Sequence, residues 1–419
     1  MESQNQRTLQ TREALGPEFR GGTTSPKTQT GRYYDVDWLR VFGIGTVFLF
    51  HCGKFFDKDG WHVKDAHVSQ VATLAINVVS QWMMPLFFVL SGISVFHALA
   101  HQKPGQFVLA RFKRLAIPLL FGTFIVIAPL QVYLERVSHG QFSGSFFTFF
   151  PHYFEGWYGY GGNFAWMGLH LWYLEMLFIF SLILLPLFVA LAREQNQSLM
   201  TGIGRLCSKP GFLFLAAILV FAMEGVTRSD LVRDTVLGWR AFGGWPLPQH
   251  FVFFLLGYFV AAIPQLRKVI ENNRIVALAM GIFIMCFAFW LIIAKGHSGD
   301  GVFFAALRSL NVIAWLIALL GFGSKYLNFK NKFLGYANEA VLPFYILHQT
   351  VLLAIGIFVV RWNIGMGTKY LLIAFSSFIV IMAIYEVFIK RMNTLRFLFG
   401  MKVPRGLRAG ASTCAFDGS

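Results

Sequence analysis

Three ionisable side chains lie in the first long apolar segment, at spacings that acid–base chemistry can use. Asp37 and Arg40 are three positions apart, and ten residues separate Arg40 from His51. On a helix, which turns by about 100° per residue, all three side chains lie on one stripe, and Arg40 and His51 are about 16 Å apart along the axis. Asp37 can pair with Arg40 at i and i+3. His51 then has no evident partner on its own helix.

His51 is the candidate catalytic residue of this stripe, and Asp37 and Arg40 belong to the same candidate group. An ionisable side chain inside an apolar span is costly, so by default it indicates function. The pKa of imidazole is near neutrality, so the ring can take a proton from a hydroxyl group and return it. The alternative is a core histidine that is hydrogen-bonded to a neighbouring helix.

A second candidate group is cationic. Arg111 and Arg114 stand at i and i+3, at the entry of a later apolar segment. Two guanidinium groups on one helix face can bind phosphate oxygens in a bidentate manner, whereas Lys113 between them points elsewhere. The pair is therefore a candidate for ligand binding. The alternative is a topology anchor, in which both side chains extend to lipid phosphates.

Four further residues are candidates for the site. His170, Trp172 and Glu175 open another apolar segment, and His348 lies in a later one. Glu175 stands inside its segment, where a carboxylate needs a partner. It can orient an imidazole, contact a substrate or belong to a structural ion pair. His170, Trp172 and His348 are candidate substrate-binding residues, although for His348 a structural role is favoured over a catalytic one.

Membrane-spanning helices must position these residues. The chain of 419 residues is 56% hydrophobic and only 13% charged, with a mean hydropathy of +0.57, whereas about a quarter of the residues in a soluble domain are charged. Its apolar residues form runs of about 20, which is the length that crosses a hydrocarbon core of about 30 Å. The predicted fold class is all-α, a polytopic membrane protein of about ten transmembrane helices with membrane lipid as a partner.

The ten predicted spans cover residues 36–56, 75–99, 115–135, 169–192, 211–226, 247–264, 274–294, 302–322, 340–360 and 369–390. The fifth and sixth have the weakest pattern. In the second, Ser91 and Gly92 are small residues, which predicts that another helix packs closely against them.

The positions of the 36 Lys and Arg residues indicate the orientation. A net charge of +16 also occurs in proteins that bind nucleic acid, but here the cations stand between apolar runs, so no nucleic-acid partner is predicted. The two ends of the chain and every second loop hold 25 of the Lys and Arg residues, and the alternate loops hold 11. By the positive-inside rule the richer set is cytoplasmic. Both termini are therefore predicted to be cytoplasmic.

The chain ends and the cysteines define the remaining organisation. Residues 1–32 are polar, without the apolar stretch of a cleaved signal, and are predicted to be a disordered cytoplasmic tail. The transmembrane domain is predicted to cover 33–395, and a second cytoplasmic tail 396–419. The four cysteines show no C-x-x-C spacing, and no close-spaced set of metal ligands appears, so no disulfide framework and no metal are predicted.

The longest predicted outer loop, at about 136–168, is rich in aromatic residues. They are Phe142, Phe146, Phe147, Tyr153, Trp157, Tyr158, Tyr160 and Trp166. Aromatic side chains gather as a belt at the membrane interface. They also form the kind of surface that stacks on sugar rings. Both interpretations remain open at this stage.

Taken together, four motifs resemble the membrane-bound acyltransferase-3 family. They are Arg40-x10-His51, Arg111-x-x-Arg114, the Phe-Phe-Val-Leu-Ser-Gly run that ends at Gly92, and Tyr345-Ile-Leu-His348. The stretches Gly60–Lys64 and Gln131–Arg136 look like those of a subgroup concerned with glucan biosynthesis. The likeness runs from about residue 32 to about residue 395. The first two motifs are fairly specific in combination, and each alone is weak.

The resemblance implies an enzyme of the plasma membrane, the inner membrane of a bacterium. It would take an acyl group, acetyl or succinyl, from cytosolic acyl-CoA to a hydroxyl of a carbohydrate or glycan at the outer face. It implies that His51 is the catalytic histidine, that Arg40 is its motif partner and that Arg111 and Arg114 are associated with the donor. Acyl-CoA enters as a donor substrate, and no bound cofactor is implied.

A transporter or flippase of a glycolipid or polyprenyl-linked glycan is the main alternative, since it would also combine many spans with buried charges. Transporters often contain paired, interrupted spans in their two halves, and no such internal symmetry is evident here. A non-catalytic membrane scaffold would leave His51 and Glu175 unexplained.

Overall fold

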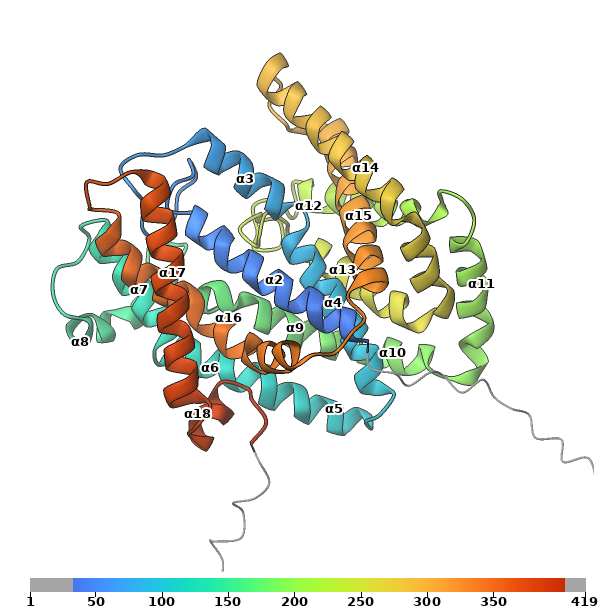
Figure 1. Ribbon diagram of the computed structural model, residues 1–419, viewed down its shortest axis with the longest axis horizontal. Coiled ribbons are helices and arrows are strands. Elements are labelled where there is room, and N and C mark those ends of the chain that lie inside the picture. The colour runs from blue at the N-terminus through green and yellow to red at the C-terminus, as the bar shows by residue number, and fades with distance from the viewer. Residues whose placement is uncertain (1–32, 404–419) are drawn as a thin grey trace, which may run out of the picture. The chain divides into compact units, whose positions relative to one another are not determined.

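Helices form nearly all the regular structure of the protein. The computed structural model describes residues 33–403, and within this range its only β feature is an isolated bridge between Trp157 and Phe164 (Figure 1). The all-α prediction is confirmed.

Seven segments of the described chain are long and apolar enough to cross a membrane. They comprise α2 (Tyr34–Gly53), α3 with α4 (Gln70–Ser80, Met83–Leu99), α5 to α7 (Pro104–Arg111, Ile117–Phe124, Ile127–Ser138), α14 (Pro264–Lys295), α15 (Gly301–Tyr326), α16 (Lys332–Val359), and α17 with the π-helix η6 (Met366–Ile384, Tyr385–Ile389). Between α5 and α6 the chain forms a further π-helix, η1 (Phe112–Ala116).

Two further apolar segments are bent. The helices η3 and α9 (Leu169–Leu171, Trp172–Ile183) meet α10 (Leu185–Leu191) at 51°, and α11 (Gln197–Cys207) meets η5 and α12 (Phe212–Leu215, Ala216–Arg228) at 112°. Pro186 lies in the first turn of α10, and a proline there ends the preceding helix and bends the segment. If each bent pair is one span, the described residues contain up to nine.

The sixth predicted span is α13 (Leu247–Ala262), an apolar helix of 16 residues. At 1.5 Å per residue it is about 24 Å long, which is shorter than a hydrocarbon core. Each of the ten predicted ranges therefore coincides with helical structure, and between seven and nine of them have the length and hydropathy of a complete span. The polytopic membrane class is confirmed.

Glycine residues bring α4 and α13 into backbone contact. A Cβ atom at Gly92 would lie 2.1 Å from the carbonyl oxygen of Phe254, and one at Gly257 would lie 2.0 Å from that of Val89. Only glycine fits such an approach, which is how small residues pack membrane helices without a hydrophobic driving force. The close packing predicted at Gly92 is present.

The helix α16 lies at the centre of the arrangement that positions the site. It contacts α2, α7 and α17, and α2 in turn contacts α4 and α15. Every residue from Pro343 to Leu353 on α16 is buried. The polar side chains in this stretch must therefore find partners inside the protein.

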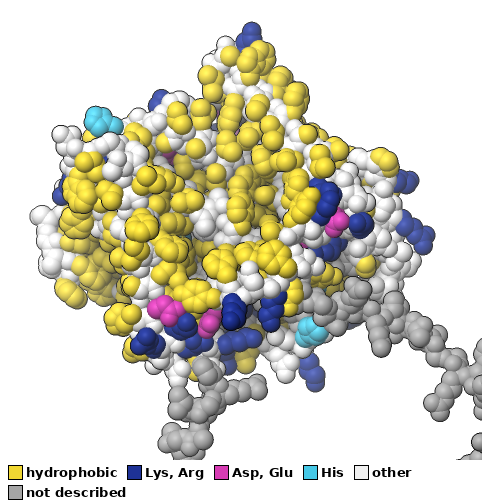
Figure 2. All heavy atoms as spheres, viewed as in Figure 1, with side chains coloured by type: hydrophobic (Ala, Val, Ile, Leu, Met, Phe, Trp, Pro, Cys, Tyr) yellow, Lys and Arg dark blue, Asp and Glu magenta, His cyan; other side chains and the backbone are white. Residues whose placement is uncertain are grey.

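Apolar side chains on the periphery suit contact with lipid. Only 17% of the apolar window of α14 is buried, and its exposed side chains include Ile275, Phe283 and Ile293. Figure 2 shows hydrophobic side chains across the middle of one face and Lys and Arg side chains along its lower edge, near α5 and α18 (Asn393–Leu398).

The folded part continues past residue 395, where we expect the transmembrane domain to end. Arg396 on α18 forms an ion pair with Glu339 on α16 at 3.1 Å. A Cβ atom at Gly400 would lie 2.6 Å from the carbonyl oxygen of Arg114. The predicted tail 1–32 lies outside the described residues, as does the part of the second predicted tail beyond residue 403.

Candidate active site

The last turn of α2 places His51 against α16. Nδ1 of His51 lies 3.1 Å from Nε2 of His348, and the centres of the two rings are 5.0 Å apart. His348 is completely buried, whereas His51 retains some exposed surface. His51 therefore has a partner, which comes from a helix almost 300 residues further along the chain.

The hydrogen bonds of this pair define which nitrogen atoms carry protons. Nδ1 of His348 lies 2.5 Å from the carbonyl oxygen of Tyr345, which can only accept, so this nitrogen is the donor. In a neutral ring Nε2 of His348 is then an acceptor, and Nδ1 of His51 must donate to it. Nε2 of His51 is left with its lone pair. An imidazole in this tautomer can act as a general base.

His170 joins the same cluster from η3. Its Nε2 lies 3.2 Å from the carbonyl oxygens of both Tyr345 and Ile346, and its Nδ1 lies 3.0 Å from the amide nitrogen of Gln131. Its ring is perpendicular to that of His348, with centres 5.0 Å apart. The Tyr345 hydroxyl donates to the carbonyl oxygen of His170. The three histidines are thus fixed around one turn of α16.

Gln131 on α7 connects this cluster to the next turn of α16. Its amide nitrogen also donates to the Thr350 hydroxyl at 2.7 Å, and its amide oxygen accepts from Gln349 at 3.2 Å. All three of these side chains are buried. A buried network in which each member has partners is rigid, so the imidazoles have defined orientations.

Arg40 occupies the other end of α2. It donates to Asp37 at 3.0 Å, as the spacing of the two residues indicates, and to the Ser94 hydroxyl on α4 at 2.8 Å. A longer contact of 3.5 Å joins it to the amide oxygen of Asn338 on α16. Arg40 is therefore bonded to three helices, including its own, about three turns from His51.

Arg111 and Arg114 lie near this cationic end. Arg111 is the last residue of α5, and Arg114 lies within the π-helix η1. Such π-helical turns are rare and often occur at functional sites. The charges of both arginines interact with the charge of Arg40. Arg111 lies over the Phe107 ring at 5.0 Å, and Arg114 is exposed. Three guanidinium groups thus gather with Asp37 at one end of the site.

A line of hydroxyl groups connects the cationic end to the histidines. Ser94 and Ser91 lie on one face of α4, and Ser91 exchanges a hydrogen bond of 2.7 Å with the Tyr173 hydroxyl on α9. The Tyr173 ring meets the Tyr345 ring edge-on at 5.7 Å, and Tyr345 belongs to the histidine cluster. The two ends of the site are therefore joined by polar and aromatic side chains.

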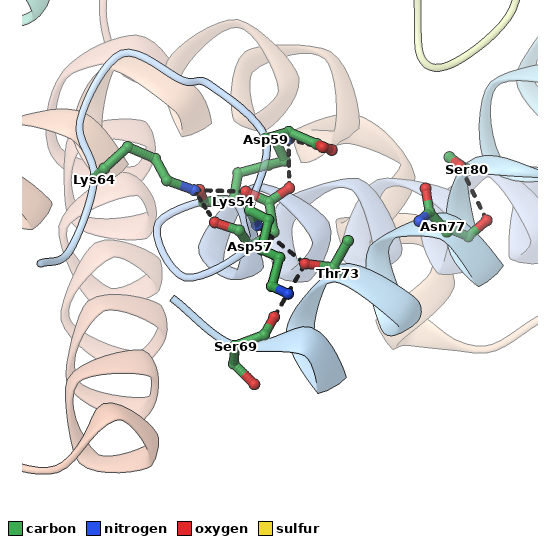
Figure 3. A network of polar contacts seen from close by, with 9 residues as sticks. Lys54, Asp57, Asp59, Lys64, Ser69, Thr73, Asn77 and Ser80 are labelled. Carbon is green, nitrogen blue, oxygen red and sulfur yellow. Dashed lines mark hydrogen bonds and ion pairs between the residues drawn. The ribbon is translucent and has the colours of Figure 1, made fainter. Parts of the chain in front are cut away.

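The loop between α2 and α3 covers the histidine end. The Trp61 ring stacks on His51, with centres 5.9 Å apart and planes at 16°. Figure 3 shows Lys54 and Lys64 converging on the fully buried Asp57, at 2.5 and 2.6 Å. These ion pairs hold the two ends of the segment that carries Trp61.

The next residue of this loop, His62, pairs with Glu135 on α7. The Tyr158 hydroxyl donates to the same carboxylate oxygen at 2.7 Å, and Arg136 approaches the other oxygen at 3.4 Å. Burial raises the pKa of the Tyr158 phenol, and the Glu135 charge raises it further, so the phenol stays protonated as the donor. We assign no role to His62 or Glu135 from the sequence, although both stand in the motifs of the glucan-related subgroup.

Two candidate residues stand apart from this arrangement. Trp172 packs among Phe88, Phe242 and His250, with ring centres between 5.1 and 5.9 Å away. Glu175 forms no hydrogen bond or ion pair with a histidine of the described chain, and its Oε2 is buried without a hydrogen-bond partner. The other candidates gather at the two ends of α2. His51, His170 and His348 lie at one end, and Asp37, Arg40, Arg111 and Arg114 at the other.

The aromatic loop divides into buried and exposed parts. Phe149 and Tyr153 are buried in a small core with Ala128 and Val132 of α7. Trp157 and Tyr160 are exposed. Many of these aromatic side chains therefore stabilise the loop itself, and the exposed ones remain available for contact with lipid or sugar.

The fold and the two-ended site together define a multi-pass membrane protein with a fixed imidazole inside its helical core. Residues 33–386 match the family model described as an acyltransferase domain, of the acyltransferase-3 type. The chain belongs to this acyltransferase family, as its motifs predict. It is similar to the curated proteins called Glucans biosynthesis protein C from Escherichia coli strains K12 DH10B, SMS-3-5 and O157:H7. Each is 23% identical over 372 residues, covering 87% of this chain and 92% of the relative. No solved structure matches the chain.

Proposed function

We propose that the protein transfers an acyl group, acetyl or succinyl, from cytosolic acyl-CoA to a hydroxyl group of a glucan. Membership of the acyltransferase family and the names of the relatives support this reaction class. The excess of Lys and Arg in alternate segments supports an orientation with both termini in the cytoplasm. The acceptor would then be modified at the outer face of a bacterial inner membrane.

The cationic end of α2 is the donor site in this proposal. Coenzyme A is polyanionic, and guanidinium groups bind phosphate oxygens with charge-assisted hydrogen bonds. Arg114 is exposed, and Arg111 and Arg40 lie near enough for their charges to interact with it or with each other. The thioester would extend from these cations toward His51, past the hydroxyl groups of Ser91 and Tyr173.

The proposed chemistry uses one proton and one imidazole. Nε2 of His51 takes the proton of the acceptor hydroxyl while the hydroxyl oxygen attacks the thioester carbonyl carbon. The C–S bond then breaks, an ester forms, and the His51 imidazolium returns the proton to the sulfur of coenzyme A. Throughout, Nδ1–H of His51 continues to donate to His348, which keeps the reactive nitrogen in place.

The observation that carries this proposal is the tautomer that His348 imposes on His51. The test uses purified full-length protein in detergent, with acyl-CoA and a gluco-oligosaccharide, and measures free thiol and acylated sugar by mass spectrometry. We expect transfer by the wild type and none by His51→Ala, with the same elution volume and melting temperature for both. Full activity in the variant would refute the assignment. If the wild type transfers no acyl group either, the alternative of a glycolipid transporter or flippase is favoured.

A further inference from the structure

His62 and Glu135 form a hydrogen-bonded pair that the chemistry above does not use. We propose that His62, oriented by Glu135, binds the carbohydrate acceptor by accepting a hydrogen bond from one of its hydroxyl groups. This inference rests on the proposed function and names the residue that positions the second substrate.

Glu135 has a partner on each carboxylate oxygen and acts through His62. Its Oε2 accepts from Tyr158 and pairs with Nδ1 of His62, its Oε1 is approached by Arg136, and its side chain is buried. Each oxygen of this buried carboxylate already has a partner. The carboxylate instead fixes the proton on Nδ1 of His62, as carboxylates do for oriented imidazoles.

The opposite nitrogen of His62 is the group that is offered to a ligand. With Nδ1 donating to Glu135, Nε2 of the neutral ring has a lone pair. Within residues 33–403 no side chain or backbone group forms a hydrogen bond with this atom, and the imidazole retains exposed surface.

The lone pair of His62 matters because this residue lies near the reactive imidazole of His51. Its neighbour Trp61 stacks on His51, with ring centres 5.9 Å apart, and the ring centres of Trp61 and His62 are 5.8 Å apart. A polyol bound at His62 would therefore hold a second hydroxyl near Nε2 of His51. Trp61 supplies an aromatic surface between the two, and an aromatic wall with few polar groups is typical of ligand sites.

The loop that carries His62 is fixed before any ligand binds. On one side of it Lys54 and Lys64 converge on Asp57 (Figure 3). On the other side Asp65 forms a buried ion pair with Lys369 on α17 at 2.5 Å. A fixed binding group costs little conformational entropy when the ligand arrives.

The surroundings favour a neutral ligand. Arg136 is the nearest cation of this cluster, and its side chain already donates to Asn163 at 2.8 Å, to Gln141 at 2.8 Å and to the carbonyl oxygen of Gly162 at 2.9 Å. The site thus offers an acceptor lone pair and aromatic surface, with no free positive charge among the described residues of the cluster. The hydroxyl groups of an uncharged sugar fit this chemistry.

The test measures KM for the gluco-oligosaccharide and for acyl-CoA, together with slow hydrolysis of acyl-CoA in the absence of sugar. We expect His62→Ala to raise KM for the sugar by about 2- to 10-fold, because one hydrogen bond is worth about 0.5–1.5 kcal/mol. KM for acyl-CoA and the hydrolysis rate should stay unchanged. His62→Gln, which keeps one donor and one acceptor, should recover part of the loss. His67→Ala is the matched control, because this exposed histidine lies in the same loop.

An unchanged KM for the sugar in His62→Ala would overturn the inference, and so would a parallel loss of acyl-CoA hydrolysis. If the wild type proves unable to transfer an acyl group, the proposed function fails and equilibrium binding of the gluco-oligosaccharide becomes the measurement. Binding that is about 2- to 10-fold weaker in His62→Ala than in the wild type supports the acceptor site. Equal binding, or no binding by the wild type, overturns it.

Discussion

Nδ1 of His51 donates a hydrogen bond to Nε2 of His348, and His348 in turn donates to the carbonyl oxygen of Tyr345. This chain of two imidazoles ends on a backbone group that cannot change its protonation. It therefore fixes His51 in the tautomer whose lone pair is on Nε2. No carboxylate takes part in the chain, so the orientation of the ring, rather than a nearby negative charge, prepares it to act as a base.

The first prediction concerns His348. We expect His348→Phe to lower kcat for acyl transfer by about 10- to 100-fold, the usual effect of losing the partner that orients a functional imidazole. KM for acyl-CoA should not change, because the donor site lies at the other end of α2. In His348→Gln the amide oxygen can accept from Nδ1–H of His51, so much of the activity should return. Steady-state kinetics of the purified variants check this, and equal kcat values for His348→Phe and the wild type would contradict it.

The second prediction concerns the two arginines near Arg40. If Arg111 and Arg114 bind the phosphates of the donor, replacing either with Gln should raise KM for acyl-CoA by about 10- to 100-fold, since a charge-assisted hydrogen bond contributes about 1.5–3 kcal/mol. KM for the sugar should remain unchanged. Lys113→Gln is the matched control because its cation lies between the two in the sequence. An unaltered donor KM would reduce the arginines to anchors at the membrane surface.

The third prediction concerns the backbone contact between α4 and α13. Gly92→Ala and Gly257→Ala each place a methyl group about 2 Å from a carbonyl oxygen of the facing helix. Overpacking costs about 1–3 kcal/mol, and here the obstacle is backbone that cannot rotate away. We expect a lower melting temperature for both variants in detergent. Gly225→Ala on α12, where a methyl group meets open space, should preserve or raise the melting temperature. If all three variants melted at the temperature of the wild type, α4 and α13 would be able to move apart at no cost in stability.

The fourth prediction concerns the buried ion pair between Asp65 and Lys369. Lys369→Met leaves an unpaired carboxylate, which costs about 3–5 kcal/mol. In the double variant Asp65→Asn, Lys369→Met no charge remains, so most of the stability should return. Thermal unfolding of the single and double variants measures this coupling. Lys268→Ala removes the mostly exposed cation of the pair with Glu271 and should change stability by less than about 0.5 kcal/mol. Additive losses in the double variant would contradict the coupling.

The fifth prediction concerns orientation. A fluorescent protein fused to the C-terminus should be bright, and a phosphatase that is active only outside the cytoplasm should be inactive there. The physical reason is the excess of Lys and Arg in the terminal segments and alternate loops. A dark fluorescent protein and an active phosphatase would place the C-terminus outside the cytoplasm. The donor and the acceptor would then have to approach from the opposite sides.

The sequence contains enough local information to predict the membrane class and the helices. Runs of apolar residues directly reflect the thickness of a bilayer, which is why every predicted span coincides with a helix. Breaks inside the spans were harder to predict. Pro186 accounts for the bend between α9 and α10, and α13 is short because Pro246 precedes it and Pro264 begins the next helix.

The sequence predicts those contacts of the candidate site that lie within a single helix. Asp37 and Arg40 pair because residues three apart on a helix face the same side. The contact between His51 and His348 depends on how α2 and α16 pack, so the sequence favoured a structural role for His348. Glu175 lacks the imidazole partner that was one of its expected roles. The sequence also contains a signal for His62 and Glu135 that we did not use. Each is a polar residue in a motif of the glucan-related subgroup.

The ion pair of Asp65 and Lys369 also ties the segment that stacks on His51 to a membrane-spanning helix. Both side chains are buried, so moving this segment away from α17 would have to break the pair. The loop that bears Trp61 is therefore anchored to α17 beside the imidazole. We expect substrates to reach His51 from beside this loop.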